Sequence, residues 1–303
     1  MYRWQEIIDE FLTDIQIKGY SKVTIQNYKY KLKNIKDYFL AQNIEFVDKV
    51  TKQDFKKWIL YLQNNGHQAN SINSISNKLK KLIGYMIEEE YMTISPFLNI
   101  KRLKIQKKVI YPLNDYEIKQ LLKAAKINRS KHISQRNVVM FMTMLETGLR
   151  VSEIANLRTD DILENQIIVK NGKGSKDRAV AITPILKKEM YKYNRIKKSK
   201  YNDQELEYYF ISYQRCKLSE KSIWGIMQAI RKQIKLRDVV RFSGHTLRHT
   251  YAHMAIRNGM DIYTLSLNMG HSQVSMTQKY LQTLKSDDFV KESIKYSTLK
   301  NLR

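Results

Sequence analysis

The sequence predicts a mainly α-helical protein of two domains, with a small β-hairpin sheet among the helices of the second. Three observations lead to this prediction. Apolar residues recur at three- and four-residue intervals through most of the chain, and two short runs rich in β-branched residues lie near its middle. Two of the only three prolines bracket a basic segment, which indicates a boundary between domains. A length of 303 residues is sufficient for two hydrophobic cores.

The N-terminal domain, residues 1–98, is predicted to be a four-helix unit. Ser21 is a good N-cap for the second helix, and residues 48–62 and 71–87 predict the third and fourth. The first helix is defined by apolar residues spaced to form one buried face: Trp4, Ile7, Ile8, Phe11, Leu12 and Ile15. Two of the helices carry a series of basic side chains: Lys22, Lys29, Lys31, Lys33, Lys78, Lys80 and Lys81.

Residues 99–112 are predicted to be a basic linker. Pro96 ends one helical region and Pro112 precedes the next, because proline disfavours helix in the residue before it. Five basic residues fall between Lys101 and Lys108. This composition suits a segment that lies along a nucleic-acid backbone, and the alternative is a plain solvated connection.

The second domain, residues 113–303, begins with a helix that Asn114 is placed to cap. A strongly apolar helix follows and is expected to end at Gly148, since glycine readily adopts the left-handed conformation of a helix C-cap. Residues 166–170 and 178–183 have the composition of short strands joined by a turn, NGKGSKD. Helices resume after this hairpin, and the last two before the tail are expected to end on glycines, Gly259 and Gly270.

The charge of the chain points to an acidic partner. Its 54 Lys and Arg against 29 Asp and Glu leave a formal net charge of +25, which indicates a polyanion and most simply nucleic acid. A solubilising surface, or the lysine-rich coding of a low-GC genome, is the alternative. One cysteine excludes an intramolecular disulfide, and no apolar run is long enough to span a membrane, so we expect a cytoplasmic protein.

The segment from His245 to Tyr280 combines residue types that handle phosphate. Arginine, here Arg248, clamps phosphate oxygens with its planar fork. Histidine transfers protons near neutral pH, and tyrosine can act as a covalent nucleophile. A TGLR sequence ending at Arg150 supplies a second guanidinium. Two arginines can neutralise the charge of a reacting phosphodiester without a metal ion.

A metal site is the competing hypothesis for the histidines of this segment. His245, His249 and His253 are spaced four residues apart, which puts them on one helix face. The metalloprotease pattern requires Glu directly after the first histidine, however, and Thr246 stands there. We therefore expect no metal, and we interpret His249 and His253 as supports of the helix.

The predicted hairpin turn carries two lysines that could enter a groove of DNA. Lys173 lies between Gly172 and Gly174, which permit a tight turn at the tip. Lys176, three residues further on, is an alternative acting residue. A routine hairpin with solvated lysines would give the same local pattern.

Together these motifs resemble those of the tyrosine recombinases, the phage integrase family, and in particular its short Xer-type members. The matching elements, in order, are Thr147-Gly-Leu-Arg150-Val-Ser-Glu153, Gly172-Lys173-Gly174, His245-Thr-Leu-Arg248-His249, Gly270-His271-Ser272 and Tyr280. The likeness covers almost the whole chain. It implies that the four-helix domain is a SAM-like core-binding domain and that the second domain is catalytic.

The resemblance implies a role for each residue of the reaction. Tyr280 attacks the scissile phosphate to give a 3′-phosphotyrosyl link, and Arg150 and Arg248 hold the non-bridging oxygens. Lys173 is the general acid for the leaving 5′-oxygen, with Lys176 as the open alternative. No cofactor is required, because the protein–DNA link conserves the energy needed for rejoining.

The same resemblance implies supporting roles for three further residues. His245 assists proton transfer, His271 donates a hydrogen bond to the phosphate, and Glu153 orients the region of Arg150. The tail departs slightly from the family pattern, with Leu281-Gln282 where related proteins often have Thr-His.

The resemblance also implies partners. The substrate is double-stranded DNA carrying a recombination core site, which a homo-tetramer cuts and rejoins through a Holliday junction. A related recombinase subunit and accessory DNA-bending proteins are further candidate partners, and no membrane is involved. A helix in the tail after Ser286 is expected to dock on a neighbouring subunit, or alternatively on its own domain. The rival functions are a type IB topoisomerase and a catalytically inactive DNA-binding regulator.

Overall fold

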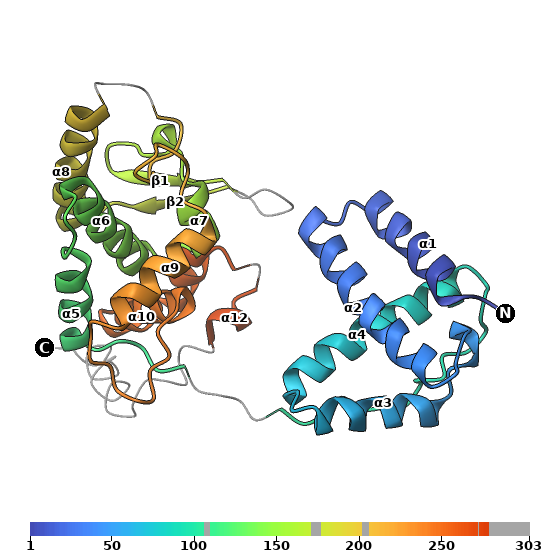
Figure 1. Cartoon of the computed structure of the whole chain (residues 1–303). Coiled ribbons are helices and arrows are strands. Elements are labelled where there is room, and N and C mark those ends of the chain that lie inside the picture. Colours follow the sequence, from blue (N-terminus) through green and yellow to red (C-terminus); the bar gives the residue numbers. More distant parts are fainter. Residues whose placement is uncertain (106–109, 171–176, 202–205, 272, 279–303) are drawn as a thin grey trace, which may run out of the picture. The chain divides into compact units, whose positions relative to one another are not determined.

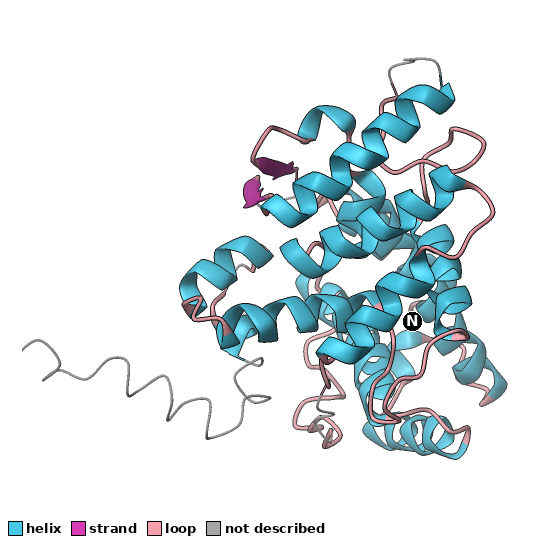
Figure 2. Cartoon of the chain, turned by 90° about the vertical axis from the view of Figure 1, so that its left-hand side faces the viewer, coloured by secondary structure: helices cyan, strands magenta, loops and turns pink. Residues whose placement is uncertain are grey.

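The computed structural model describes residues 1–105, 110–170, 177–201, 206–271 and 273–278 (Figure 1). Helices form most of the described chain, and one antiparallel pair of short strands forms its sheet (Figure 2). The chain divides into two compact units, Met1–Lys107 and Lys108–Arg303. The mainly helical fold class with a small hairpin sheet is therefore confirmed.

Residues 1–105, the described part of the first unit, contain four α-helices. They are α1 (Trp4–Ile17), α2 (Lys22–Ala41), α3 (Lys52–Asn64) and α4 (Ala69–Glu88), with a 3₁₀ turn at Val47–Lys49. All six apolar residues predicted for the first helix are buried. Their spacing puts them on one face, which packs against α2 and α4.

Capping residues determine where two of these helices begin. Ser21 caps α2 as predicted, because its hydroxyl accepts a hydrogen bond from the amide of Thr24 at 3.2 Å. The predicted start of the third helix at Asp48 is wrong. Thr51 and Asp54 form a reciprocal capping box, with N–H···O distances of 3.2 and 3.1 Å, and this fixes the start of α3 at Lys52.

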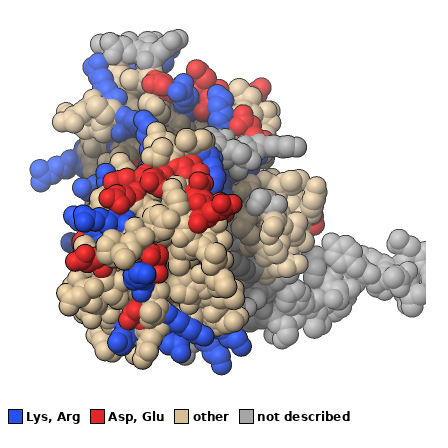
Figure 3. Space-filling view, turned by 90° about the vertical axis from the view of Figure 1, so that its right-hand side faces the viewer, with Lys and Arg blue, Asp and Glu red and all other residues tan. Residues whose placement is uncertain are grey.

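Charge in the first unit is segregated by helix. Helix α1 carries four acidic residues and no lysine or arginine, whereas α2 and α4 carry the lysines noted above. On the face drawn in Figure 3, acidic side chains gather in a band between basic ones. Acidic and basic side chains are thus separated from each other on this face.

The segment after α4 is attached to that helix. Asn73 brackets the backbone of Leu103, accepting from its amide and donating to its carbonyl at 2.9 Å each. The ammonium group of Lys80 donates to the carbonyl of Ile100 at 2.9 Å. These bonds hold the first basic residues of the predicted linker along the same unit that carries the α4 lysines.

The second unit is built around α6 (Lys131–Thr147). Every residue of α6 from Asn137 to Met144 is buried, as expected for a helix with neighbours on all sides. It packs against α5, α8 and α10. The other elements are α5 (Asp115–Ala125), α7 (Val151–Asn156), a 3₁₀ turn (Thr159–Asp161), β1 (Gln166–Val169), β2 (Arg178–Ala181), α8 (Pro184–Tyr201), α9 (Glu220–Arg231), α10 (Gly244–Arg257), α11 (Ile262–Met269) and α12 (Ser275–Gln278).

The two strands pair in the register Ile167↔Val180 and Val169↔Arg178. Ile167, Val169 and Val180 are buried in the core of the unit, so the sheet is anchored by one face. Asn114 caps α5 as predicted, in a capping box with Glu117 whose two hydrogen bonds are 2.9 Å long. Within the described residues, no helix combines the length and apolar character needed to cross a bilayer.

A buried histidine lies near the start of α6. His132 is 2% exposed, and its ring lies 5.6 Å from that of Tyr193 and 5.2 Å from that of Tyr201, measured between ring centres. Neither ring nitrogen has a hydrogen-bond partner among the described residues. Burial, with the nearby cations Lys200 and Arg136, lowers the pKa of His132 to about 4.

This histidine should make the protein acid-sensitive. The unfolded chain binds a proton near pH 6.5 whereas the folded chain does so near pH 4, so stability should fall as pH decreases between these values. The linked loss is about 3 kcal/mol for a difference of this size. His132→Phe should remove that slope, which urea titrations of both proteins from pH 7.5 to 4 would measure. An unchanged slope would show that His132 does not titrate in this way.

Candidate active site

The turn between α6 and α7 carries the first candidate arginine. Gly148 ends α6 with a φ of +64°, as predicted for a glycine C-cap, and Arg150 is the N-cap residue of α7. The backbone amide of Arg150 donates to Oε2 of Glu153 at 2.8 Å, and its Nη1 donates to Oε1 at 2.8 Å. The side chain of Arg150 is 37% exposed, so it is partly accessible to solvent.

Helix α10 carries the second candidate arginine. The hydroxyl of Ser243 caps this helix by accepting from the amide of Thr246 at 3.2 Å. Arg248 follows in the next turn and is only 5% exposed. Its Nη1 donates to the carbonyl of Gly148 at 2.7 Å, which joins α10 to the α6–α7 turn.

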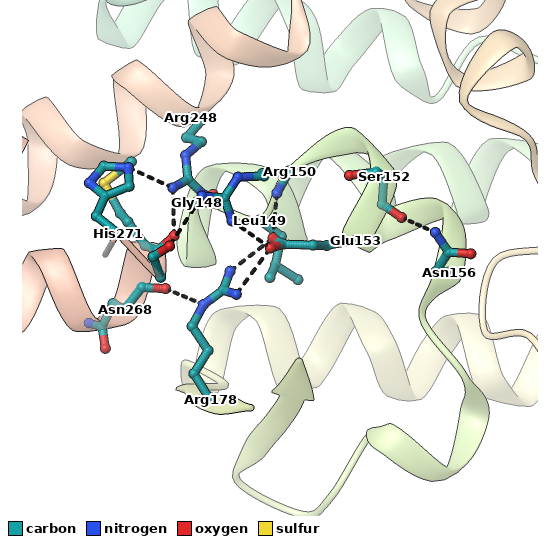
Figure 4. A network of polar contacts seen from close by, with 12 residues as sticks. Gly148, Leu149, Arg150, Ser152, Glu153, Asn156, Arg178, Arg248, Asn268 and His271 are labelled. Carbon is teal, nitrogen blue, oxygen red and sulfur yellow. Dashed lines mark hydrogen bonds and ion pairs between the residues drawn. The ribbon is translucent and has the colours of Figure 1, made fainter. Parts of the chain in front are cut away.

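The C-terminal end of α11 brings three arginines together (Figure 4). Gly270 caps this helix with a φ of +62°, again as predicted. Successive carbonyls accept hydrogen bonds from three guanidinium groups: Asn268 from Nε of Arg178 at 2.8 Å, Met269 from Nη2 of Arg248 at 2.5 Å, and Gly270 from Nη2 of Arg150 at 3.2 Å. The last carbonyls of a helix lack intrahelical donors and form the negative end of its dipole, so they suit these cations.

His271 connects this cluster to α12. Its Nε2 lies 2.9 Å from Nη2 of Arg248, and its Nδ1 lies 2.8 Å from Oγ1 of Thr277. Because a guanidinium only donates, Nε2 must accept, which places the proton of the neutral ring on Nδ1. Thr277 is buried and stands three residues before Tyr280.

The carboxylate of Glu153 balances part of the positive charge. Both of its oxygens also accept from Arg178, at 3.0 and 2.8 Å, and its side chain is 7% exposed. Burial raises the pKa of Glu153, but the hydrogen bonds from Arg178 and Arg150 outweigh it and hold this pKa below its usual value. Glu153 is therefore an ionised carboxylate shared by two guanidinium groups.

The other histidines of α10 differ in exposure. His245 lies in the first turn and is exposed, three residues before Arg248. His249 and His253 are partly buried on the same helix. Among the residues that the structure describes, no group of three or more His, Cys, Asp or Glu is arranged to hold a metal ion.

The structure thus brings Arg150, Arg248 and His271 into one network and places His245 on the same helix as Arg248. Lys173, Lys176 and Tyr280 lie outside the described residues. The tail helix expected after Ser286 lies outside them as well.

Two residues of the network were not singled out from the sequence, Arg178 and Thr277. Arg178 is the first residue of the predicted second strand, and a charged residue at that position is also typical of an exposed strand end. Its burial depends on Glu153, 25 residues away in sequence. For Thr277, the sequence offers one indication of a role, which is its place in the short segment between His271 and Tyr280.

Family models match both units of the chain. The model of the Phage integrase family matches residues 97–287. The model described as Phage integrase, N-terminal SAM-like domain, matches residues 8–90.

Two tyrosine recombinases match the chain over most of their own length. Tyrosine recombinase XerD of Staphylococcus aureus is 28% identical over 285 residues, which cover 93% of this chain and 95% of the relative. Tyrosine recombinase XerA of Pyrococcus horikoshii is 29% identical over 283 residues, which cover 91% and 88%.

Solved structures share the fold at lower identity. The Tn1549 transposon integrase in complex with a circular intermediate DNA has a TM-score of 0.77 at 17% identity, covering 98% of this chain and 100% of the other. A lambda integrase dimer bound to a COC′ core site has a TM-score of 0.73 at 17% identity, covering 92% and 77%.

Gly148 should tolerate no side chain. A Cβ built there would lie 2.3 Å from Cδ1 of Tyr251, at a φ that L-residues rarely adopt. We expect Gly148→Ala to lower the free energy of unfolding by at least about 2 kcal/mol, from backbone strain and overpacking. Chemical denaturation measures this loss. Gly225→Ala is the matched control, because a Cβ at that helical position meets nothing within 4 Å and should stabilise by about 0.5 to 1 kcal/mol. Equal stability of the two variants would contradict this account of the turn.

Proposed function

The chain belongs to the phage integrase family and is a tyrosine site-specific recombinase, and we propose that it exchanges DNA strands through a covalent 3′-phosphotyrosyl intermediate. The observation that carries the mechanism is the meeting of Arg150, Arg248 and His271 at the end of α11. Charge-assisted contacts to the non-bridging oxygens would stabilise the negative charge that develops on the phosphorus centre.

In the proposed reaction, the Tyr280 hydroxyl attacks the scissile phosphorus. The bond from phosphorus to the 5′-oxygen breaks, and that oxygen takes a proton from Lys173. Arg150 and Arg248 hold the two non-bridging oxygens, while His245 assists proton transfer by taking the proton that the Tyr280 hydroxyl loses. Attack by a 5′-hydroxyl on the phosphotyrosyl bond reverses these steps and rejoins the DNA without ATP.

His271 has a proposed position in this reaction beside the phosphate. With the proton on Nδ1 it receives a hydrogen bond from Arg248 at Nε2, so it orients that guanidinium. When Nε2 is protonated, the ring becomes a donor that can reach a phosphate oxygen, as the family resemblance implies. Its bond to Thr277 connects the same ring to the helix that leads toward Tyr280.

The proposed partner is double-stranded DNA with a core site, bound by both units. The lysines of α2 and α4 and the attached segment up to Lys104 give the first unit basic elements for phosphate contacts. The solved relatives in complex with a core site and with a circular intermediate support this.

A homo-tetramer that exchanges strands in pairs through a Holliday junction is the assembly we propose. A related recombinase subunit in place of some copies, and accessory DNA-bending proteins, remain part of that proposal. The tail would join neighbouring subunits. A cytoplasmic location follows from a DNA substrate. Matches over both units to proteins named as recombinases favour this function over a type IB topoisomerase or an inactive regulator.

Tyr280→Phe should abolish covalent attachment to DNA. A duplex with a nick beside the cleavage point loses a short 5′-hydroxyl fragment after attack, so the wild-type adduct accumulates and shifts on a denaturing gel. The variant lacks the nucleophilic oxygen and should give no adduct while still binding DNA. Tyr263→Phe, at an exposed tyrosine of α11, is the control and should react like wild type. An adduct formed by Tyr280→Phe would assign the nucleophile elsewhere.

The general acid can be identified by a leaving group that needs no proton. Lys173→Ala should cut ordinary DNA at least about 100-fold more slowly, the usual contribution of general acid catalysis. A 5′-phosphorothiolate at the scissile bond should restore the rate, because a thiolate leaves unprotonated. Lys176→Ala tests the alternative with the same two substrates, and rescue confined to that variant would make Lys176 the acid.

A further inference from the structure

We propose that Arg178 is a positioning residue, which neutralises Glu153 and thereby keeps the guanidinium of Arg150 directed at the phosphate. This inference rests on the proposed function, since it concerns how the phosphate-binding guanidinium of Arg150 is positioned. Arg178 is the first residue of β2 and is paired with Val169 across the ladder, at the base of the hairpin. Through Glu153, a residue at this place connects the hairpin to Arg150.

The contacts of Arg178 are those of a fixed structural cation. Its side chain is 9% exposed. Nη1 and Nη2 donate to the two oxygens of Glu153, and Nε donates to the carbonyl of Asn268. Gly270 lies directly against it, because a Cβ on that glycine would be 2.9 Å from Nη1 of Arg178. The planar fork is thus held on three sides.

Arg150 and Arg178 share one carboxylate, and this sharing determines how tightly Arg150 is held. Oε1 of Glu153 accepts from Nη1 of both arginines, at 2.8 and 3.0 Å. A buried carboxylate needs a cation, and without Arg178 that cation would be Arg150 alone. Arg150 would then be drawn further onto Glu153 and away from a bound phosphate. With Arg178 present, two of the five guanidinium N–H donors of Arg150 are used among the described residues, by Glu153 and by the carbonyl of Gly270.

The position of Arg248 should not depend on Arg178 or on Glu153. It donates to the carbonyls of Gly148 and Met269 and contacts His271, while Glu153 pairs with the other two arginines. Loss of Arg178 should therefore resemble a partial loss of Arg150, and two modified substrates can show this. A methylphosphonate at the scissile position removes the negative charge that Arg150 offsets. A 5′-phosphorothiolate removes the need for a proton from the hairpin lysine.

The test compares Arg178→Met with wild type on the nicked duplex, together with these two modified duplexes. We expect cleavage of the ordinary phosphodiester to slow about 100-fold, the effect of a displacement near 1 Å, while DNA binding changes less than about threefold. The methylphosphonate should bring the variant within about fivefold of wild type, as it should for Arg150→Ala. The phosphorothiolate should give no recovery. Adding Arg178→Met to Arg150→Ala should cause little further loss, since both act on one contact.

Arg237→Met is the matched control. Arg237 also forks a buried glutamate in the same unit, with Nε and Nη2 on Glu117 at 3.0 and 2.9 Å, and it also donates to a carbonyl, that of Pro112 at 2.7 Å. It should lower the melting temperature without altering the cleavage rate or its response to the methylphosphonate. If Arg178→Met folds poorly, Arg178→Lys keeps the charge but not the fork and should show the same pattern more weakly.

Three results would overturn the proposal. Recovery of Arg178→Met on the phosphorothiolate alone would mean that it acts through the hairpin lysine. If Arg178→Met recovers on neither modified substrate, Arg178 only stabilises the fold. The same conclusion holds if Arg237→Met gives the pattern expected of Arg178→Met. Failure of the proposed function is separate, because wild-type protein would then form no Tyr280 adduct on any substrate.

Discussion

The buried carboxylate of Glu153 is the interaction on which the rest of the site depends. A carboxylate removed from water is costly unless cations and hydrogen bonds surround it. Glu153 meets this requirement with the backbone amide and guanidinium of Arg150 and the fork of Arg178. These partners come from the α6–α7 turn and from β2. One charge therefore connects two elements that α7, a 3₁₀ turn and β1 separate in the sequence. The low pKa of Glu153 reflects the same balance.

Glycines allow α6, α10 and α11 to pack closely around the site. Gly148 allows α6 to end against the ring of Tyr251, and Gly270 allows the end of α11 to lie against Arg178. Gly244, at the start of α10, has the same function, since a Cβ there would be 2.2 Å from Cγ2 of Val151 on α7. A Cβ at any of these glycines would lie 2.2 to 2.9 Å from a neighbouring side-chain atom, so the elements would have to move apart. That movement would lengthen the hydrogen bonds from the arginines to the carbonyls at the end of α11.

The sequence predicted well those features that local chemistry determines. The apolar face of α1, the caps at Ser21 and Asn114 and the glycine ends at Gly148 and Gly270 need only neighbouring residues, and all of them are confirmed. The start of α3 was predicted too early, because the residues before Thr51 are as apolar as those of the helix. The capping box at Thr51 is what determines the actual start. Arg178 could not be found in this way. Its role depends on partners 25 and 90 residues distant, and only the tertiary fold brings them together.

The way in which the arginines are held bears on how they can act. Carbonyl groups at a helix end orient a guanidinium without cancelling its charge, whereas a carboxylate does both. Arg248 donates to two such carbonyls, and so it is fixed in direction while its positive charge is retained. Arg150 shares Glu153 with Arg178, and the second cation offsets the charge that Arg150 would otherwise lose to the carboxylate. A site that must stabilise growing negative charge on phosphorus gains from cations that are oriented beforehand, because no reorganisation is then required during the reaction.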